Sequence, residues 1–157
     1  MIIRPALAGD WPRVGELAER LVRMHYDFDS SRFVHPGALS ANVYTAHVQD
    51  EIDRGNGVVH VADQDGRVVG YVFAGVEPEN WKELRHQAGY IHDLVVDSAH
   101  RRTGVGHALI ASAVDWFAAR GVKRVMLWSA PQNADAQRLF RSVGFRPTMI
   151  EMTLDRE

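Results

Sequence analysis

The chain has 157 residues, of which 46% are hydrophobic and 24% are charged, and its formal net charge is −2 at pH 7. This length is enough for one domain with a proper core and too short for two, so we expect a single domain over residues 1–157. A chain that is not strongly basic argues against broad electrostatic binding to nucleic acid. It contains no cysteine, which excludes a disulfide framework, a thiol nucleophile and thiolate metal sites.

The N-terminal stretch MIIRPALAGDWPRV has no long apolar run after a basic start, so no signal peptide is expected. No segment reaches the roughly 18 apolar residues that a membrane span needs. These features predict a soluble, cytoplasmic protein that does not bind membranes.

The N-terminal half is predicted to form a strand, two helices and a hairpin. Residues 2–6 predict a short strand, and Asp10 is the expected N-cap of a helix with a regular apolar face. An irregular, aromatic segment over 25–37 separates it from a second helix that begins at about Ser40. Two strands then flank Asp65-Gly66, a dipeptide suited to a tight hairpin turn.

In the second half, strands and helices alternate. Residues 88–96 predict a strand buried on both faces, and a glycine-containing bend then opens a helix that ends near Arg120. A strand over 122–128, a helix over 133–145 and a closing strand over 146–154 are expected to follow. This order of elements predicts an α/β protein in which helices cover both faces of a mixed sheet.

The stretch HDLVVDSAHRRTGVGHALI, residues 92–110, runs from an apolar strand through a polar bend into a helix. Such a bend directs unpaired N–H groups at one point, where the helix N-terminus adds partial positive charge, so we expect a bound phosphate. A Walker A loop would need Lys and Ser or Thr where His107 and Ala108 stand, and a dinucleotide fingerprint would need glycine in place of Leu109. Both nucleotide motifs therefore fail.

What remains is the pattern Arg101-x-x-Gly104-x-Gly106. It resembles the pyrophosphate loop of the GNAT superfamily of N-acetyltransferases. The first strand and helix, the hairpin DGRVVGYVFAGV and the closing segment NADAQRLFRSVGFRPTMIEMTL are similar to that family too, so only about residues 25–57 lie outside the resemblance. The resemblance implies a GNAT-like fold: a mixed, mostly antiparallel sheet of about six or seven strands, about four flanking helices, and splayed strands at the acyl-CoA site.

The resemblance also implies acetyl-CoA as the acyl donor. Free backbone groups of the strand before the loop would pair with the pantetheine arm, and the loop amides would receive the pyrophosphate. Glycines are needed there because a Cβ would block close approach or unusual torsions. The expected acetyl-CoA-binding residues are Leu94, Val95, Val96, Arg101, Arg102, Thr103, Gly104, Val105, Gly106, His107, Asn133 and Phe140.

Acyl transfer to an amine needs an uncharged amine, a polarised thioester carbonyl and a proton for the leaving thiolate. Strand alternation predicts that His92, and not Asp93, shares the face of Leu94 and Val96, so His92 is the expected general base, where many relatives carry Glu. The alternative is that His92 is a structural strand residue. Asp93 would orient His92, bind a cationic substrate or satisfy a neighbouring backbone group.

Position 140 departs from the family pattern. The usual tyrosine, credited with protonating the CoA sulfur, is replaced by Phe140, which can pack against pantetheine but cannot donate a proton. The proton for the CoA sulfur would then come from water, Ser129, Ser142 or a tyrosine of the variable segment, about residues 25–57. Otherwise a general acid is dispensable, or catalysis is lost.

The resemblance implies that four residues of the variable segment line the acceptor pocket: Tyr26, Asp27, Phe28 and Phe33. A solvated loop with buried aromatic residues explains them equally well. The resulting prediction is an enzyme that moves an acetyl group directly from acetyl-CoA to a primary amine of a small molecule or peptide in a ternary complex, because no cysteine can carry the acyl group.

No metal is expected, and the resemblance alone suggests a homodimer. A non-catalytic acyl-CoA sensor, favoured by Phe140, is the main alternative. A nucleotide-phosphate-binding protein is a third reading, disfavoured by the failed motifs.

Overall fold

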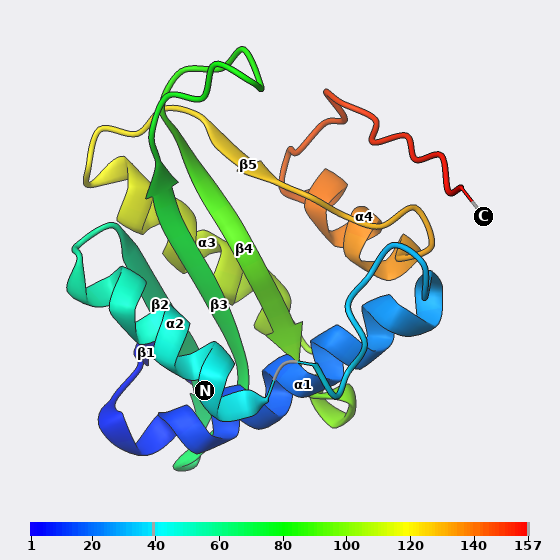
Figure 1. Ribbon diagram of the computed structural model, residues 1–157. Coiled ribbons are helices and arrows are strands. Elements are labelled where there is room, and N and C mark those ends of the chain that lie inside the picture. The colour runs from blue at the N-terminus through cyan, green and yellow to red at the C-terminus, as the bar shows by residue number, and fades with distance from the viewer. Residues whose placement is uncertain (39, 157) are drawn as a thin grey trace.

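A computed structural model describes the whole chain except residues 39 and 157 (Figure 1). The strands are β1 (Ile2–Pro5), β2 (Gly57–Gln64), β3 (Arg67–Glu77), β4 (Ala88–Val96) and β5 (Val125–Leu127). The helices are α1 (Trp11–Phe28), α2 (Ala41–Asp53), α3 (Val105–Ala118) and α4 (Ala134–Ser142), with short 3-10 helices at η1 (Ala8–Asp10) and η2 (Ser98–His100). Among the described helices, none is long and apolar enough to cross a membrane.

The strands form one five-stranded sheet in the order β1-β2-β3-β4-β5. The first four pair antiparallel, and β5 pairs parallel with β4, which confirms the mixed, mostly antiparallel sheet. Asp65 and Gly66 both have positive φ, 54° and 81°, as the tight turn between β2 and β3 requires. The predicted hairpin is therefore confirmed.

Helices cover both faces of the sheet, as Figure 1 shows with α1 and α2 in front and α3 behind. On the α3 face, Leu109, Ile110 and Phe117 pack into a core that also takes in Phe140 of α4. On the other face, α1 and α2 pack over a second core that includes Tyr71 of β3. Burying apolar side chains on both faces is the main source of stability for such a sheet.

The N-terminal helices differ from prediction at their edges. α1 continues to Phe28, so residues 25–28 of the segment expected to be irregular form its last turn. Asp10 occupies the N-cap position, but its carboxylate accepts a hydrogen bond from Arg4 at 2.6 Å and does not cap α1. α2 begins at Ala41, close to the predicted start at about Ser40, and the Ser40 hydroxyl caps it by accepting from the Val43 N–H at 3.4 Å.

The closing strand predicted over 146–154 does not form, and the strand predicted over 122–128 shortens to β5. The sheet accordingly has five strands instead of six or seven. A strand needs a neighbour for its backbone N–H and C=O groups. Residues 146–156, here called the C-terminal tail, leave α4 at Gly144 with φ 97° and pair with no strand within the described chain.

Candidate active site

The parallel pairing of β4 and β5 is short. Only Gly89–Ile91 of β4 pairs with β5, although β4 continues to Val96. Beyond that point the two strands diverge (Figure 1). In the described part of the chain, the β5-facing edge of β4 from His92 onward thus has no strand partner, which confirms the predicted splay.

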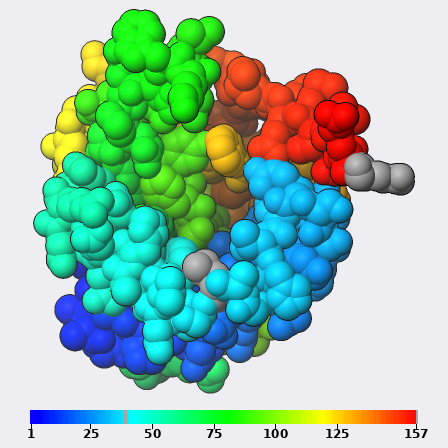
Figure 2. Space-filling view, viewed as in Figure 1, coloured from blue at the N-terminus to red at the C-terminus, as the bar shows by residue number. Residues whose placement is uncertain are grey.

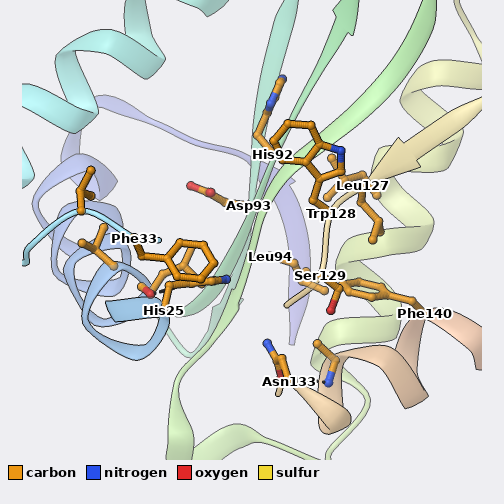
Figure 3. Close-up of a pocket in the computed structure, with 15 residues that line it drawn as sticks. His25, Phe33, His92, Asp93, Leu94, Leu127, Trp128, Ser129, Asn133 and Phe140 are labelled. Atoms are coloured by element: carbon orange, nitrogen blue, oxygen red, sulfur yellow. Dashed lines mark hydrogen bonds between the residues drawn. The ribbon is translucent and has the colours of Figure 1, made fainter. Parts of the chain in front are cut away.

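A cavity of about 260 Å³ lies at this splay, and Figure 2 shows the surface hollowed between the green strands and the red C-terminal tail. Its lining comes from the end of α1 and the segment after it, from β4, from the residues at and after the end of β5, and from α4 (Figure 3). The lining residues are Leu21, Val22, His25, Phe33, Val34, Ile91, His92, Asp93, Leu94, Leu127, Trp128, Ser129, Asn133, Ala136 and Phe140.

A β-bulge in β4 sits at the cavity. Phe73 of β3 pairs with Asp93, while the next residue, Ala74, pairs with Ile91, so His92 is the extra residue. A bulge breaks the alternation of side chains along a strand and re-aims the residues around it. The alternation of side chains along β4 therefore does not predict where the His92 side chain points.

The contacts of His92 and Asp93 show that both face the α1–α2 side of the sheet. The His92 ring lies 4.8 Å from the Phe73 ring, and Asp93 accepts a hydrogen bond from Tyr71, and both partners belong to the α1–α2 core. Leu94 instead packs against the α3 core. The prediction that His92 alone shares the face of Leu94 was wrong, because the bulge intervenes.

Asp93 lies deep in the cavity with a single protein donor in the described chain. The Tyr71 hydroxyl donates to its Oδ2 at 2.9 Å. Loss of solvent raises the pKa of Asp93 to about 7, and burial also raises the pKa of Tyr71, which keeps that hydroxyl protonated. A carboxylate with a pKa close to neutrality can both accept and release a proton at pH 7.

His92 lies beside Asp93 between two aromatic rings. Its ring is 5.3 Å from that of Tyr90, and its Nε2 is 3.2 Å from Oε1 of Glu77. Burial lowers the pKa of His92, and the Glu77 carboxylate opposes this by a smaller amount. The imidazole is therefore neutral at pH 7 and can accept a proton or a hydrogen bond.

The glycine bend leads from η2 into α3 as predicted. Arg102 and Gly104 have positive φ, 62° and 90°, and the first helical hydrogen bond runs from the Ala108 N–H to the Gly104 carbonyl at 3.1 Å. The N–H groups of residues 105–107 therefore have no hydrogen-bond partner inside the helix, and free N–H groups at a helix N-terminus are suited to bind an anion. Gly106 has an added role, because a Cβ there would lie 2.8 Å from Leu139 Cδ2 of α4.

The α4 side of the cavity carries Ser129, Asn133 and Phe140. The Ser129 Oγ is buried and has no hydrogen-bond partner among the described residues. Asn133 Oδ1 accepts from the Ala136 N–H at 3.2 Å as the N-cap of α4, which leaves its NH₂ group to donate elsewhere. The Phe140 ring is 9% exposed and lines the cavity.

Residues 21–145 match the protein family described as Acetyltransferase (GNAT) family. The chain belongs to the GNAT acetyltransferase family. The match covers most of the chain and includes the splay, the bulge and the glycine bend.

Curated relatives of this GNAT chain resemble it over part of their length. A mycothiol acetyltransferase from Clavibacter michiganensis is 31% identical over 90 residues, which are 57% of this chain and 27% of that protein. Human N-acetyltransferase 8 is 33% identical over 88 residues, 56% of this chain and 38% of the relative. The matched region thus spans well under half of either relative.

Solved structures of similar fold match nearly the full chain. A tetramutant of the BH1408 protein from Bacillus halodurans has a TM-score of 0.83 and 25% identity, covering 99% of this chain and 100% of that one. An aminoglycoside 6′-N-acetyltransferase from Acinetobacter haemolyticus has a TM-score of 0.76 and 19% identity, covering 100% and 99%. At that lower identity the likeness shows the fold alone.

Only one of the four residues predicted to bind the acceptor lines the cavity. Phe33 lines the cavity, whereas Tyr26, Asp27 and Phe28 are not among the residues that line it. His25 does line it, with its ring 4.9 Å from that of Phe33. His25 was missed because it was placed in an irregular segment, although it follows the apolar Leu21 at helical spacing.

Proposed function

We propose that this chain is an acetyl-CoA-dependent N-acyltransferase that acetylates a primary amine of a small molecule by direct transfer in a ternary complex. The observation that carries the proposal is a carboxylate of pKa about 7, Asp93, inside a cavity at the β4–β5 splay. The names of relatives agree with it, because they include mycothiol and glucosamine 6-phosphate acetyltransferases. One structure of similar fold is that of an aminoglycoside N-acetyltransferase in complex with CoA.

The donor fits along the open edge of β4. Backbone N–H and C=O groups from His92 to Val96, which lack a partner strand on the β5 side, would pair with the amides of the pantetheine arm. The first turn of α3 would receive the pyrophosphate, and Arg101 and Arg102 would add positive charge. The Phe140 ring would pack against the arm near its sulfur.

Asp93 is the proposed general base, with neutral His92 beside it. A primary ammonium would be drawn to the ionised carboxylate and then lose its proton to it. Asp93 would pass this proton to solvent and become ionised again. The amine nitrogen would then attack the thioester carbonyl carbon, the C–S bond would break, and the second proton of the nitrogen would pass to Asp93. The buried Tyr71 hydroxyl would hold the carboxylate in place throughout.

Ser129 is the proposed hydrogen-bond donor to the leaving thiolate, which solvent then protonates. Its Oγ is buried without a partner among the described residues, and it lines the same cavity wall as Phe140 (Figure 3). The other serine considered, Ser142, is already engaged: its hydroxyl donates to the Leu139 carbonyl at 2.7 Å and lies 2.9 Å from His107 Nε2. Ser142 does not line the cavity.

A non-catalytic acyl-CoA sensor is the second candidate, and Phe140 favours it, because the residue that usually donates a proton is missing. Calorimetric titration with acetyl-CoA, followed by thiol-release assays and mass spectrometry across polyamines, aminoglycosides, amino sugars, amino acids and peptides, separates the two. We expect binding together with transfer to at least one amine class. Binding without transfer across the panel would support the sensor, and the absence of binding would overturn both.

A further inference from the structure

The cavity at the splay is poor in positive charge. Among the described residues that line it, none is lysine or arginine, whereas Asp93 supplies a carboxylate. An acceptor that carries a phosphate or a carboxylate next to its amine would meet no cationic side chain of these types there, and an unpaired buried anion is costly. The lining therefore favours an amine that carries no anionic group.

A second carboxylate touches the cavity lining at His92. Glu77, the last residue of β3, has its Oε1 3.2 Å from the Nε2 of His92. Because burial lowers the pKa of His92, the imidazole is neutral at pH 7 and does not neutralise Glu77. Glu51 of α2, whose charge also acts on His92, is paired with Arg54 at 3.1 Å. Glu77 has no such lysine or arginine partner in the described chain, so it is available to a bound cation.

Aromatic rings lie around His92 and continue to the cavity wall. The Tyr90 ring is 5.3 Å from that of His92 and meets the Trp128 ring edge-on at 6.0 Å. Trp128 is 70% exposed, and both it and His92 line the cavity (Figure 3). Aromatic faces attract ammonium groups, and they can bury the methylene chain that joins two such groups. This wall therefore suits a cation with an aliphatic body.

The Tyr90 hydroxyl lacks a hydrogen-bond partner. Tyr90 is 9% exposed, and its hydroxyl is buried without a partner in the described chain. Burial raises the pKa of Tyr90 to about 12, and the charges of Glu83 and Glu77 act in the same direction, so this hydroxyl stays protonated within electrostatic reach of Glu77. Buried polar groups nearly always have a partner. An ammonium group bound at Glu77 would supply a donor to it.

The pairing of β3 with β4 limits the separation of the two carboxylates. Asp93 pairs with Phe73, and Glu77 is four residues further along β3, which is about 13 Å at the usual rise per residue. The Glu77 side chain reaches back to His92, the neighbour of Asp93, so the two carboxylates are closer than this. Two ammonium groups joined by one aliphatic chain can therefore reach both carboxylates.

We propose that the acceptor is an aliphatic diamine or polyamine, bound with one ammonium group at Asp93 and a second at Glu77, while its methylene chain lies against the rings of His92 and Tyr90. The inference rests on the proposed function, because the amine at Asp93 is the one that is acetylated. Glu77 is then a specificity-determining residue: it holds the far end of the acceptor and so directs the near amine towards the thioester.

Three acceptors of equal chain length test the charge requirement: an α,ω-diaminoalkane, the 1-aminoalkane and the ω-amino acid. They differ only at the far end, which is positive, neutral or negative. We expect kcat/KM from thiol release at saturating acetyl-CoA to fall in that order. The diamine should exceed the monoamine roughly tenfold, the lower end for a hydrogen bond to a charged group, because the Glu77 side chain is 37% exposed. Longer diamines should show an optimum of chain length.

Variants of Glu77 test the residue itself. Glu77→Gln should bring kcat/KM of the diamine close to that of the monoamine, and Glu77→Lys should place the ω-amino acid above the diamine, because the charge that meets the far end is reversed. Glu79→Gln removes an equal charge from the loop after β3, where Glu79 faces His86, and as the matched control it should keep the wild-type order.

The outcomes separate this inference from the proposed function. If wild type acetylates the diamine and the monoamine with equal kcat/KM, or if both Glu77 variants keep the wild-type order, the second ammonium site is wrong and the acetyltransferase proposal stands. If wild type transfers acetyl to no amine, both are overturned.

Discussion

The extra residue in β4 brings His92 and Asp93 to the same face of the sheet, and the two differ in their surroundings. Asp93 is held by Tyr71 and has a pKa of about 7, whereas burial lowers the pKa of His92 from its ordinary value of 6.5. A general base acts in its deprotonated form, so the rate rises as pH rises through the pKa of the base. The two candidates therefore predict different pH profiles.

We expect kcat/KM of wild type to rise through about pH 7, as Asp93 loses its proton. Asp93→Asn keeps the shape and the contact with Tyr71 but cannot accept a proton, and should lower kcat/KM roughly 10²–10⁴-fold. His92→Gln should retain the step near pH 7. The general base would instead be His92 if kcat/KM of wild type rises at a pH below 6.5, and if this rise is lost in His92→Gln but kept in Asp93→Asn.

The same carboxylate affects stability. The folded pKa of Asp93 is raised from 3.8 to about 7, so the stability it contributes is present below pH 3.8 and is lost as pH rises through 7. Asp93→Asn should therefore unfold at a higher temperature than wild type at pH 8 and at nearly the same temperature at pH 4. A gain of roughly 1–3 kcal/mol at pH 8 is expected, after allowance for solvent in the cavity. An equal effect at both pH values would contradict the raised pKa.

Ser129 and Ser142 form a matched pair of serines, one in the cavity and one outside it. Ser129→Ala should lower kcat about 10- to 100-fold, as expected for a hydrogen bond to a charged group, and leave the Kd for acetyl-CoA unchanged. Ser142→Ala should change neither. Restoration of turnover by Phe140→Tyr in the Ser129→Ala background would support a donor role, while full activity of Ser129→Ala would remove it.

At the scale of single residues, the sequence predicted the cavity residues of β4 but not their orientation. His92 and Asp93 both line the cavity. The bulge that orients these two side chains is not marked by an adjacent glycine or proline in β4. It arises from the way β4 pairs with Phe73 and Ala74, in a strand about twenty residues earlier. Predicting side-chain orientation from alternation along a strand assumes a regular pairing register. An irregular register is seen only when the neighbouring strand is known.

At the scale of elements, the entry to α3 can be tested with two comparable glycines. Gly104 and Gly121 both have positive φ, 90° and 70°, and a Cβ at either would meet no atom of the described chain within 4 Å. Alanine should therefore cost each about 1 kcal/mol of stability through backbone strain. Only Gly104→Ala should weaken acetyl-CoA binding, because its methyl group would stand where the pyrophosphate approaches; equal Kd values for the two variants would contradict the site.

Elements defined by local chemistry were predicted well. The Asp65-Gly66 turn and the start of α2 at about Ser40 depend on neighbouring residues alone, and both are confirmed. The closing strand over 146–154 has an equally clear pattern but does not form, since a strand depends on a partner that sequence does not locate.

At the scale of the whole molecule, the GNAT fold with its splayed strands was predicted because the family's motifs run in order along most of the chain. The segment between α1 and α2 falls in the part that the resemblance did not cover, and it supplies Phe33 and Val34 to the cavity. This segment is therefore the part of the cavity that the sequence predicted least.

The most direct test of the central claim is amine-dependent thiol release at saturating acetyl-CoA, measured with the acetylated amine by mass spectrometry, for wild type and Asp93→Asn. We predict one thiol released for each amine acetylated by wild type, and turnover lowered at least about 10²-fold in Asp93→Asn with acetyl-CoA affinity unchanged. Wild type that binds acetyl-CoA but acetylates no amine, or Asp93→Asn that turns over at the wild-type rate, would contradict the account.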